Sequence, residues 1–255
     1  MSETAQATTS RVWAYLELAR ISNLPTVWSN VLVGCALGAT AGAATPNGGI
    51  VPFPWRAALA LAMAMSSFYI AGMVLNDVMD VAVDRLERPS RPIPSGRVSR
   101  RSATVVAVAL LGAGMLIVAL VNVQALPPAT MLLLLILAYD AAHRRYAALV
   151  VLLGVCRMMV YQISAVAICW PLPQPLPLSN AAIPATMLIY VVILSLIARR
   201  EAGNPRRIRI VLVLLAGISL LDAVFLVGLR MIVPALVAVA CFALTRIGHR
   251  WIKGT

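Results

Sequence analysis

Three aspartates stand close together between residues 76 and 84 of this chain. The segment runs Asn-Asp-Val-Met-Asp-Val-Ala-Val-Asp, so its carboxylates belong to Asp77, Asp80 and Asp84. On a continuous helix, at about 100° per residue, the three side chains fall within about 60° of one face. Three like charges on one face repel one another and need a counter-charge, and carboxylate oxygens suit a magnesium ion that keeps its waters and binds substrate phosphates. The spacing therefore predicts a magnesium site for a phosphorylated ligand.

An arginine-rich loop follows the aspartates directly. Residues 85–101 contain six arginines, and Pro89, Pro92 and Pro94 hold this part of the chain extended. Planar guanidinium groups match phosphate oxygens bidentately, and beside carboxylate-bound magnesium they would complete a diphosphate site. The alternative is a charged helix end followed by an ordinary basic loop. Aligned aspartates at the boundary of an apolar helix favour the diphosphate site.

The elements that must position these residues are membrane spans. The chain has 255 residues, of which 61% are hydrophobic and 12% charged, whereas soluble domains are about 45–50% apolar. Apolar runs of about 20 residues are long enough to cross a hydrocarbon core about 30 Å thick. We therefore predict an all-α, polytopic transmembrane bundle of about eight spans that forms a single membrane domain over residues 1–255. The spans are expected near 21–43, 57–81, 102–123, 126–142, 147–169, 183–199, 208–229 and 231–248.

The basic residues give the orientation of the spans. Of the 21 Lys and Arg residues, 18 fall in the segments on one side of the predicted spans, and the positive-inside rule makes that side cytoplasmic. Both termini are then cytoplasmic, including the short N-terminal segment 1–11, as are the motif-bearing loops 82–101 and 200–209. The net charge of +12 is spread over short loops, so nucleic-acid binding is not expected. We predict a multi-pass protein of the cytoplasmic membrane.

The segment 76–84 resembles the first motif of the UbiA superfamily of intramembrane prenyltransferases, NDxxDxxxD. The stretch 88–96 is similar to the family's RPxPSG loop, and the stretch 20–26, Arg-Ile-Ser-Asn-Leu-Pro-Thr, is similar to its opening helix. The stretch 139–145 resembles a Tyr-then-Lys-Arg pattern after the fourth helix, with Arg144 where Lys is usual. The resemblance covers nearly the whole chain.

The resemblance implies both an activity and a set of site residues. Members bind a prenyl diphosphate through magnesium held by two Asp-rich motifs, ionise it, and let a lipophilic or aromatic acceptor attack the allylic carbon. Asp77, Asp80 and Asp84 would bind Mg²⁺ and, with Glu201, act in catalysis. The residues that would bind the diphosphate are Arg20, Asn23, Asn76, Arg88, Arg91, Tyr139, Arg144 and Arg199.

The second motif departs from the family pattern. Members carry a DxxxD sequence after the sixth span, whereas residues 195–203 of this chain contain a single acid, Glu201. One carboxylate cannot replace two or three without weakening a second magnesium. This short form is similar to the EboC-like branch of the family.

Two functions of different classes stay open at this point. The intact first motif favours a prenyltransferase, and the reduced second motif favours a non-catalytic membrane carrier or assembly factor for a precursor metabolite. A third interpretation keeps the ionisation but traps the cation with water or an internal double bond, as a phosphatase or cyclase would.

Several residues inside the spans are also informative. Arg157 and Asp222 are costly in hydrocarbon and are expected to pair or to line the cavity. Tyr69, Tyr161 and Tyr190 are expected to pack in the core, with a place in the pocket wall as the alternative.

The four cysteines are single and are expected to be small buried hydrophobic residues. A pair of glycines, Gly34 and Gly38, serves either packing within the chain or a homodimer, and membrane lipid is an expected partner. His143 and His249 are assigned no role.

Overall fold

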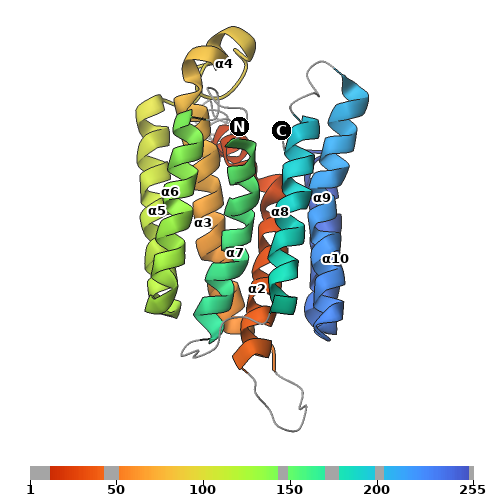
Figure 1. The fold of residues 1–255 in the computed structure, drawn as a ribbon. Coiled ribbons are helices and arrows are strands. Elements are labelled where there is room, and N and C mark those ends of the chain that lie inside the picture. Colours follow the sequence, from red (N-terminus) through yellow and green to blue (C-terminus); the bar gives the residue numbers. More distant parts are fainter. Residues whose placement is uncertain (1–11, 43–51, 143–148, 170–177, 199–203, 253–255) are drawn as a thin grey trace, which may run out of the picture.

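A computed structural model describes residues 12–42, 52–142, 149–169, 178–198 and 204–252. These residues form helices and their connections, without a strand (Figure 1). After a helical stretch over residues 12–18, the elements are η1 (Ile21–Asn23), α2 (Leu24–Gly42), α3 (Trp55–Met79), α4 (Val81–Glu87), α5 (Arg100–Val121), η2 (Val123–Ala125), α6 (Leu126–Ala142), α7 (Val150–Cys169), α8 (Leu178–Ala198), α9 (Pro205–Gly228) and α10 (Ile232–Gly248).

Every predicted span corresponds to a helix, so the all-α polytopic fold is confirmed. Seven helical stretches are long and apolar enough to cross a membrane, whereas α10 has 17 residues and is shorter. Most of the surface of α5 faces outward, and this helix is strongly apolar. Side chains such as Leu116 and Leu120 are therefore exposed to the lipid, which is their natural solvent.

Helix α2 lies at the centre of the bundle, where it contacts α3, α7, α9 and α10. Two of its residues explain its close approach to α7. A Cβ atom added at Gly34 would lie 2.6 Å from the Cβ of Ser164, and one added at Gly38 would lie 2.6 Å from the carbonyl oxygen of Ala165. The glycine pair thus serves packing within the chain, and a homodimer stays a prediction without support from this motif.

A polar network holds α2 to α7 and α9 inside the bundle. The carboxylate of Asp222 accepts hydrogen bonds from Ser29, Asn30 and Tyr161. The guanidinium of Arg157 donates to Asn30 Oδ1 at 2.7 Å. Asn30 therefore bridges the two charges, and the described residues show no direct ion pair between them.

The structure also answers the expectations for the interior tyrosines and cysteines. Tyr161 is fully buried, and Tyr190 is half-buried and donates a hydrogen bond to the carbonyl of Leu214, so both pack in the core as predicted. Tyr69 instead lines a cavity described below. The four cysteines are free thiols, of which three are buried and Cys156 is half-buried.

The helix that carries Asp77 ends before Asp80 and Asp84, so the prediction of one uninterrupted helix face is wrong. Helix α3 ends at Met79, and Asp80 is the bend residue before α4. The backbone hydrogen bonds nevertheless run through the bend, because Asp80 N–H bonds Asn76 and Asp84 N–H bonds Asp80. The short helix α4 lies at one end of the bundle, beyond the ends of α3 and α5 (Figure 1).

The loop between α4 and α5 is tied down on the same end. Gly96 adopts a φ of 78°, which glycine reaches at no steric cost. Arg97 reaches from this loop to Glu17 of the N-terminal helical stretch, with 2.9 Å between Nη1 and Oε2. Ser99 then caps α5 by accepting from the Ser102 amide. These contacts fix the arginine-rich loop over the aspartates.

Candidate active site

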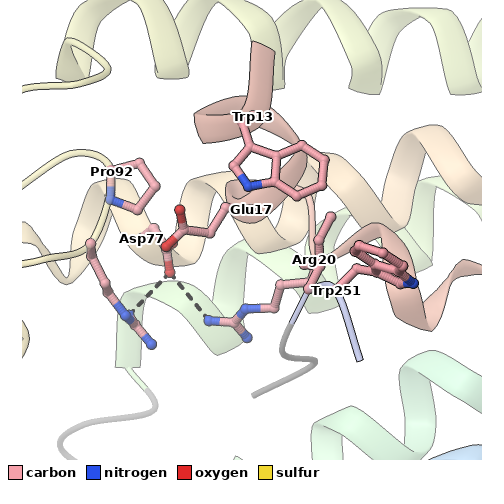
Figure 2. A pocket seen from close by; sticks show the side chains of 8 residues that line it. Trp13, Glu17, Arg20, Asp77, Pro92 and Trp251 are labelled. Carbon is pink, nitrogen blue, oxygen red and sulfur yellow. Dashed lines mark hydrogen bonds and ion pairs between the residues drawn. The ribbon is translucent and has the colours of Figure 1, made fainter. Parts of the chain in front are cut away.

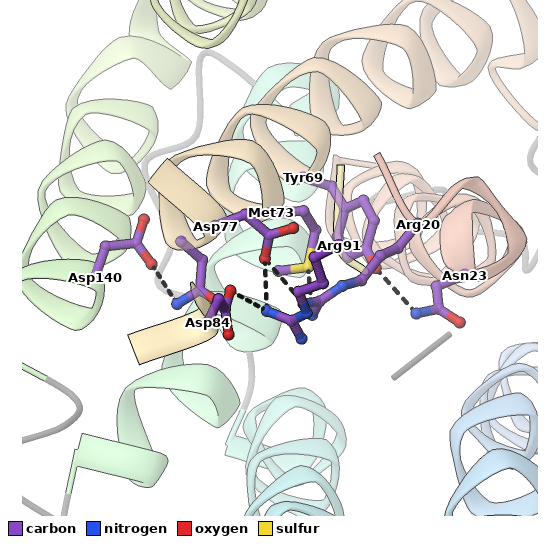
Figure 3. Close-up of polar contacts among 9 residues, drawn as sticks. Arg20, Asn23, Tyr69, Met73, Asp77, Asp84, Arg91 and Asp140 are labelled. Atoms are coloured by element: carbon purple, nitrogen blue, oxygen red, sulfur yellow. Dashed lines mark hydrogen bonds and ion pairs between the residues drawn. The ribbon is translucent and has the colours of Figure 1, made fainter. Parts of the chain in front are cut away.

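Two of the three aspartates meet at one arginine. Arg91 Nη1 lies 3.2 Å from Asp77 Oδ1 and 2.7 Å from Asp84 Oδ2. Arg20 Nη2 approaches the same Asp77 oxygen at 3.3 Å (Figure 3). Asp84 comes from α4 and Arg91 from the following loop, whereas Arg20 precedes α2. The bend at Asp80 therefore still lets the carboxylates converge with arginines from two other segments.

The aspartates are buried although they carry charge. The exposed fractions are 5% for Asp77, 7% for Asp80 and 2% for Asp84. Burying carboxylates is costly unless they are paired or bind a metal. Arg20 and Arg91 supply the compensating charge for Asp77, and Arg91 supplies it for Asp84. The site is therefore built to hold opposite charges close together and away from bulk water.

Arg20 occupies an unusual backbone conformation. Its φ of 44° and ψ of 48° place it in the left-handed region, where a non-glycine residue costs of order 1–3 kcal/mol. The turn into η1 directs its guanidinium toward the sulfur of Met73 and the carboxylate of Asp77. The surrounding contacts thus keep a strained residue beside the aspartates.

Asn23 connects the N-terminal and C-terminal parts of the chain. Its Nδ2 donates to the hydroxyl of Tyr69 at 3.0 Å, and its Oδ1 lies 2.8 Å from Nε2 of His249. His249 directly follows α10. The end of the last helix therefore contacts Asn23, a residue predicted to bind the diphosphate. Burial and the nearby positive charge of Arg246 lower the pKa of His249 to about 4, which keeps its imidazole neutral near pH 7.

Two cavities flank the cluster of Arg20, Asp77 and Arg91. The outer one, of about 360 Å³, is lined by these three residues together with Glu17 and Trp13 among others (Figure 2). The inner one, of about 420 Å³, is within the usual range of ligand pockets. Both arginines line both cavities, so a ligand in either one would meet the same cations.

The inner cavity has a polar end and an apolar body. Its polar lining includes Arg20, Asn23, Asn76, Asp80, Arg88, Arg91 and Tyr139, and its apolar lining includes Met65, Phe68, Leu132 and Val160. Nine of the predicted site residues thus gather here or contact a member of this lining, as Asp77 and Asp84 do through Arg91. Arg144, Arg199 and Glu201 lie outside the described residues.

Two charged residues of this lining, Arg157 and Asp140, differ in how far the sequence predicted them. Arg157 was predicted either to pair or to line the cavity, and it does line it, whereas Asp222 is fully buried away from it. Asp140 was not predicted at all. It directly follows Tyr139, it is 7% exposed, and it lines the inner cavity. A single acid at a helix end gives no spacing pattern, so only its adjacency to Tyr139 could have indicated it.

The residues present fit a magnesium ion that is completed by its ligand. Within the described ranges, no group of three or more acidic, His or Cys residues is close enough to hold a metal by itself. However, the oxygens of Asp77 and Asp84 already converge on one positively charged nitrogen. Mg²⁺ is commonly bound through one or two carboxylates plus water and substrate phosphate, which this arrangement can supply.

Comparison with protein families agrees with this geometry. The model described as the UbiA prenyltransferase family matches residues 31–253. Because the match covers most of the 255 residues, this chain belongs to the UbiA prenyltransferase family, a family of membrane proteins. The resemblance read from the motifs is thereby confirmed, and the finer placement in the EboC-like branch stays a prediction.

Individual relatives resemble parts of the chain or its whole fold. The digeranylgeranylglyceryl phosphate synthase of Saccharolobus solfataricus is 33% identical over 117 residues, which are 44% of this chain and 36% of that protein. The synthase of Ignicoccus hospitalis is 40% identical over 105 residues, 41% of this chain and 30% of that protein. The match thus spans about a third of the length of these relatives.

A solved structure shares the fold over a longer range. A UbiA homologue from Archaeoglobus fulgidus, bound to DMAPP and Mg²⁺, superposes with a TM-score of 0.55 and 17% identity. The superposition covers 91% of this chain and 84% of the homologue. At this identity the likeness concerns the fold.

Proposed function

We propose that this protein transfers a prenyl group from a prenyl diphosphate to a lipophilic acceptor, with Mg²⁺, at the cytoplasmic face of the cytoplasmic membrane. The observation that carries the proposal is the position of Asp77, Asp84, Arg20 and Arg91 at the polar end of a cavity with apolar walls. The names of the relatives and the DMAPP and Mg²⁺ bound to a homologue of the same fold support it.

The polar end is suited to a diphosphate. Arg20 and Arg91 present guanidinium groups that match phosphate oxygens, and Arg88 lines the same cavity. The first two also form ion pairs with Asp77. When a diphosphate enters, they would turn toward its oxygens. Asp77, Asp80 and Asp84 would then hold Mg²⁺, which would neutralise the charge that develops on the leaving diphosphate.

The apolar body of the cavity is suited to the prenyl chain. Phe68, Met65 and Leu132 contribute apolar side chains to its walls. The ring of Tyr69 also lines this space, with its hydroxyl held by Asn23, and an aromatic face attracts a nearby cation. The walls would thus protect an allylic carbocation from hydrolysis.

The proposed reaction breaks the bond between the allylic carbon and the diphosphate oxygen. The diphosphate leaves with the electron pair and is stabilised by Arg20 and Arg91, because preorganised cations are most effective where charge develops. A nucleophilic atom of the acceptor then bonds to the allylic carbon, and the acceptor loses a proton. The names of the relatives make a glyceryl phosphate lipid the first acceptor to assay.

A pyrophosphate-release assay tests the proposal. Purified protein in lipid nanodiscs would be given DMAPP, geranyl diphosphate or geranylgeranyl diphosphate with Mg²⁺ and an acceptor. We expect Mg²⁺-dependent release in wild type, its loss in Asp77→Asn, and normal release in Glu87→Gln, an exposed acid of α4. Product analysis would separate a prenylated acceptor from a free alcohol or a cyclic product.

The second candidate function is a non-catalytic carrier or assembly factor. The observation that favours it is the single acid, Glu201, in the segment where the family has its second Asp-rich motif. Saturable binding of prenyl diphosphates, with no pyrophosphate release at any chain length, would establish the carrier and refute the transferase.

A further inference from the structure

Asp140 is a carboxylate of the inner cavity that the proposed reaction has not used. It lies in the last turn of α6, which ends at Ala142. The residue is 7% exposed and lines the inner cavity together with Asp80 and Asn76. It therefore faces the space in which the diphosphate would sit, from a helix other than the one that carries the first motif.

Only one of its two oxygens has a partner. Asn76 Nδ2 donates to Oδ1 over a long 3.4 Å (Figure 3). The other oxygen, Oδ2, is buried and has no hydrogen-bond partner among the described residues. Buried polar groups are normally satisfied, and an exception indicates a missing partner such as an ion or a water molecule. Asp140 thus has an acceptor atom without a partner among the described residues, and its side chain borders the cavity.

The electrostatic surroundings favour a cation at that atom. Burial is the main factor that disfavours the charged form of Asp140, the like charges of Asp80 and Asp77 disfavour it further, and Asn76 and Arg20 favour it. Both Arg20 and Arg91 are engaged with Asp77, and Arg91 also with Asp84. An additional cation beside Asp140 would therefore favour its ionised form.

The segment that corresponds to the second Asp-rich motif is poor in carboxylates. Residues 195–203 carry one acid, Glu201, where two or more are expected for the second Asp-rich motif. We propose that Asp140 supplies a carboxylate for a second divalent cation, on the α6 side of the bound diphosphate. The proposal rests on the proposed function, and Asn76 would be a positioning residue that orients Asp140.

The donor set is sufficient for such a cation. The described part of the chain holds no cluster of three metal-binding side chains, so the ion would be completed by water and by diphosphate oxygens. Mg²⁺ is usually bound in this way. The second cation is then expected to bind only together with a diphosphate.

Mn²⁺ binding followed by electron paramagnetic resonance tests the proposal without turnover. Wild type, Asp140→Asn, Asp140→Glu and the exposed control Glu87→Gln would be titrated with Mn²⁺ in nanodiscs, with geranyl thiolodiphosphate as a slowly ionising probe. We expect two bound ions in wild type and in Glu87→Gln. In Asp140→Asn, affinity for the second ion should fall at least about 10-fold. This is the lower end of the loss seen when a group that hydrogen-bonds to a metal ligand is removed. Asp140→Glu should recover part of it, and this variant also serves if Asp140→Asn does not fold.

The outcomes separate this inference from the proposed function. Wild type that releases pyrophosphate but binds a single Mn²⁺ keeps the proposed function and overturns the role of Asp140. Two tightly bound ions in Asp140→Asn overturn it as well. If wild type binds no Mn²⁺ with the probe and releases no pyrophosphate, both proposals are wrong.

Discussion

Replacing Arg91 by alanine would leave two buried carboxylates without the cation that they share. Arg91 is 16% exposed in its side chain and contacts Asp77 at 3.2 Å and Asp84 at 2.7 Å. Removing one partner of a buried pair costs about 3–5 kcal/mol. Asp77 keeps Arg20 at 3.3 Å, so we expect the lower end, about 3 kcal/mol. At about 2–4 °C per kcal/mol, the melting temperature would fall by about 6–12 °C.

The same substitution should weaken the proposed chemistry and strengthen the response to magnesium. Loss of one preorganised donor to a developing anion typically lowers kcat by about 10²–10³. Because Asp84 loses the ion pair that the described residues give it, added Mg²⁺ should raise the melting temperature of Arg91→Ala more than that of wild type. Differential scanning fluorimetry with and without Mg²⁺, combined with the pyrophosphate assay, measures both effects.

Arg85→Ala is the matched control, since it removes an exposed arginine of α4. It should melt within about 1 °C of wild type, as surface substitutions usually change stability by less than about 0.5 kcal/mol. The reasoning would be refuted if Arg91→Ala behaved like Arg85→Ala in stability, in activity and in its response to Mg²⁺.

Three further predictions concern the bundle and its pH response. Gly34→Ala places a Cβ 2.6 Å from a side chain of α7 and should cost about 1–3 kcal/mol. Gly112→Ala, which meets open space, should be neutral or slightly stabilising, and equal melting temperatures would contradict the packing argument. Asp222→Ala removes the acceptor of three hydrogen bonds and the counter-charge of Arg157, so the yield of folded protein should drop sharply, while the double variant with Arg157→Met should recover part of it. The lowered pKa of His249, about 4 against 6.5, means that the unfolded chain takes up the proton first. Its contribution to stability is complete above pH 6.5 and is lost as the pH falls toward 4. His249→Gln should flatten the fall in melting temperature over this range, and an unchanged slope would disprove the assignment.

The spans and the first motif were predictable from the sequence because each depends on local information. Apolar runs of sufficient length are visible without knowledge of neighbours, and Asp77, Asp80 and Asp84 combine residue type with spacing. The bend at Asp80 was missed, because the angular arithmetic assumes a helix that continues.

Contacts between distant segments could not be predicted in the same way. His249 reaches Asn23 across 226 positions, and Asp140 reaches Asn76 across 64. Neither residue belongs to a periodic pattern, and their positions follow from how the helices pack. For Arg157 the cost of burying charge indicated that it faces inward, but not that Asn30 would bridge it to Asp222.

The bridge formed by Asn30 restricts how this chain can change over evolutionary time. Arg157, Asn30 and Asp222 lie on three different helices. Arg157 donates a hydrogen bond to Asn30, and Asn30 donates one to Asp222, inside the bundle. Replacing any one of them alone leaves a charge or an amide without a partner in the apolar interior of the bundle. A sequence with only one of these changes would therefore fold poorly. Related chains are therefore expected to keep all three residues, or to exchange the acidic and basic members for apolar ones together.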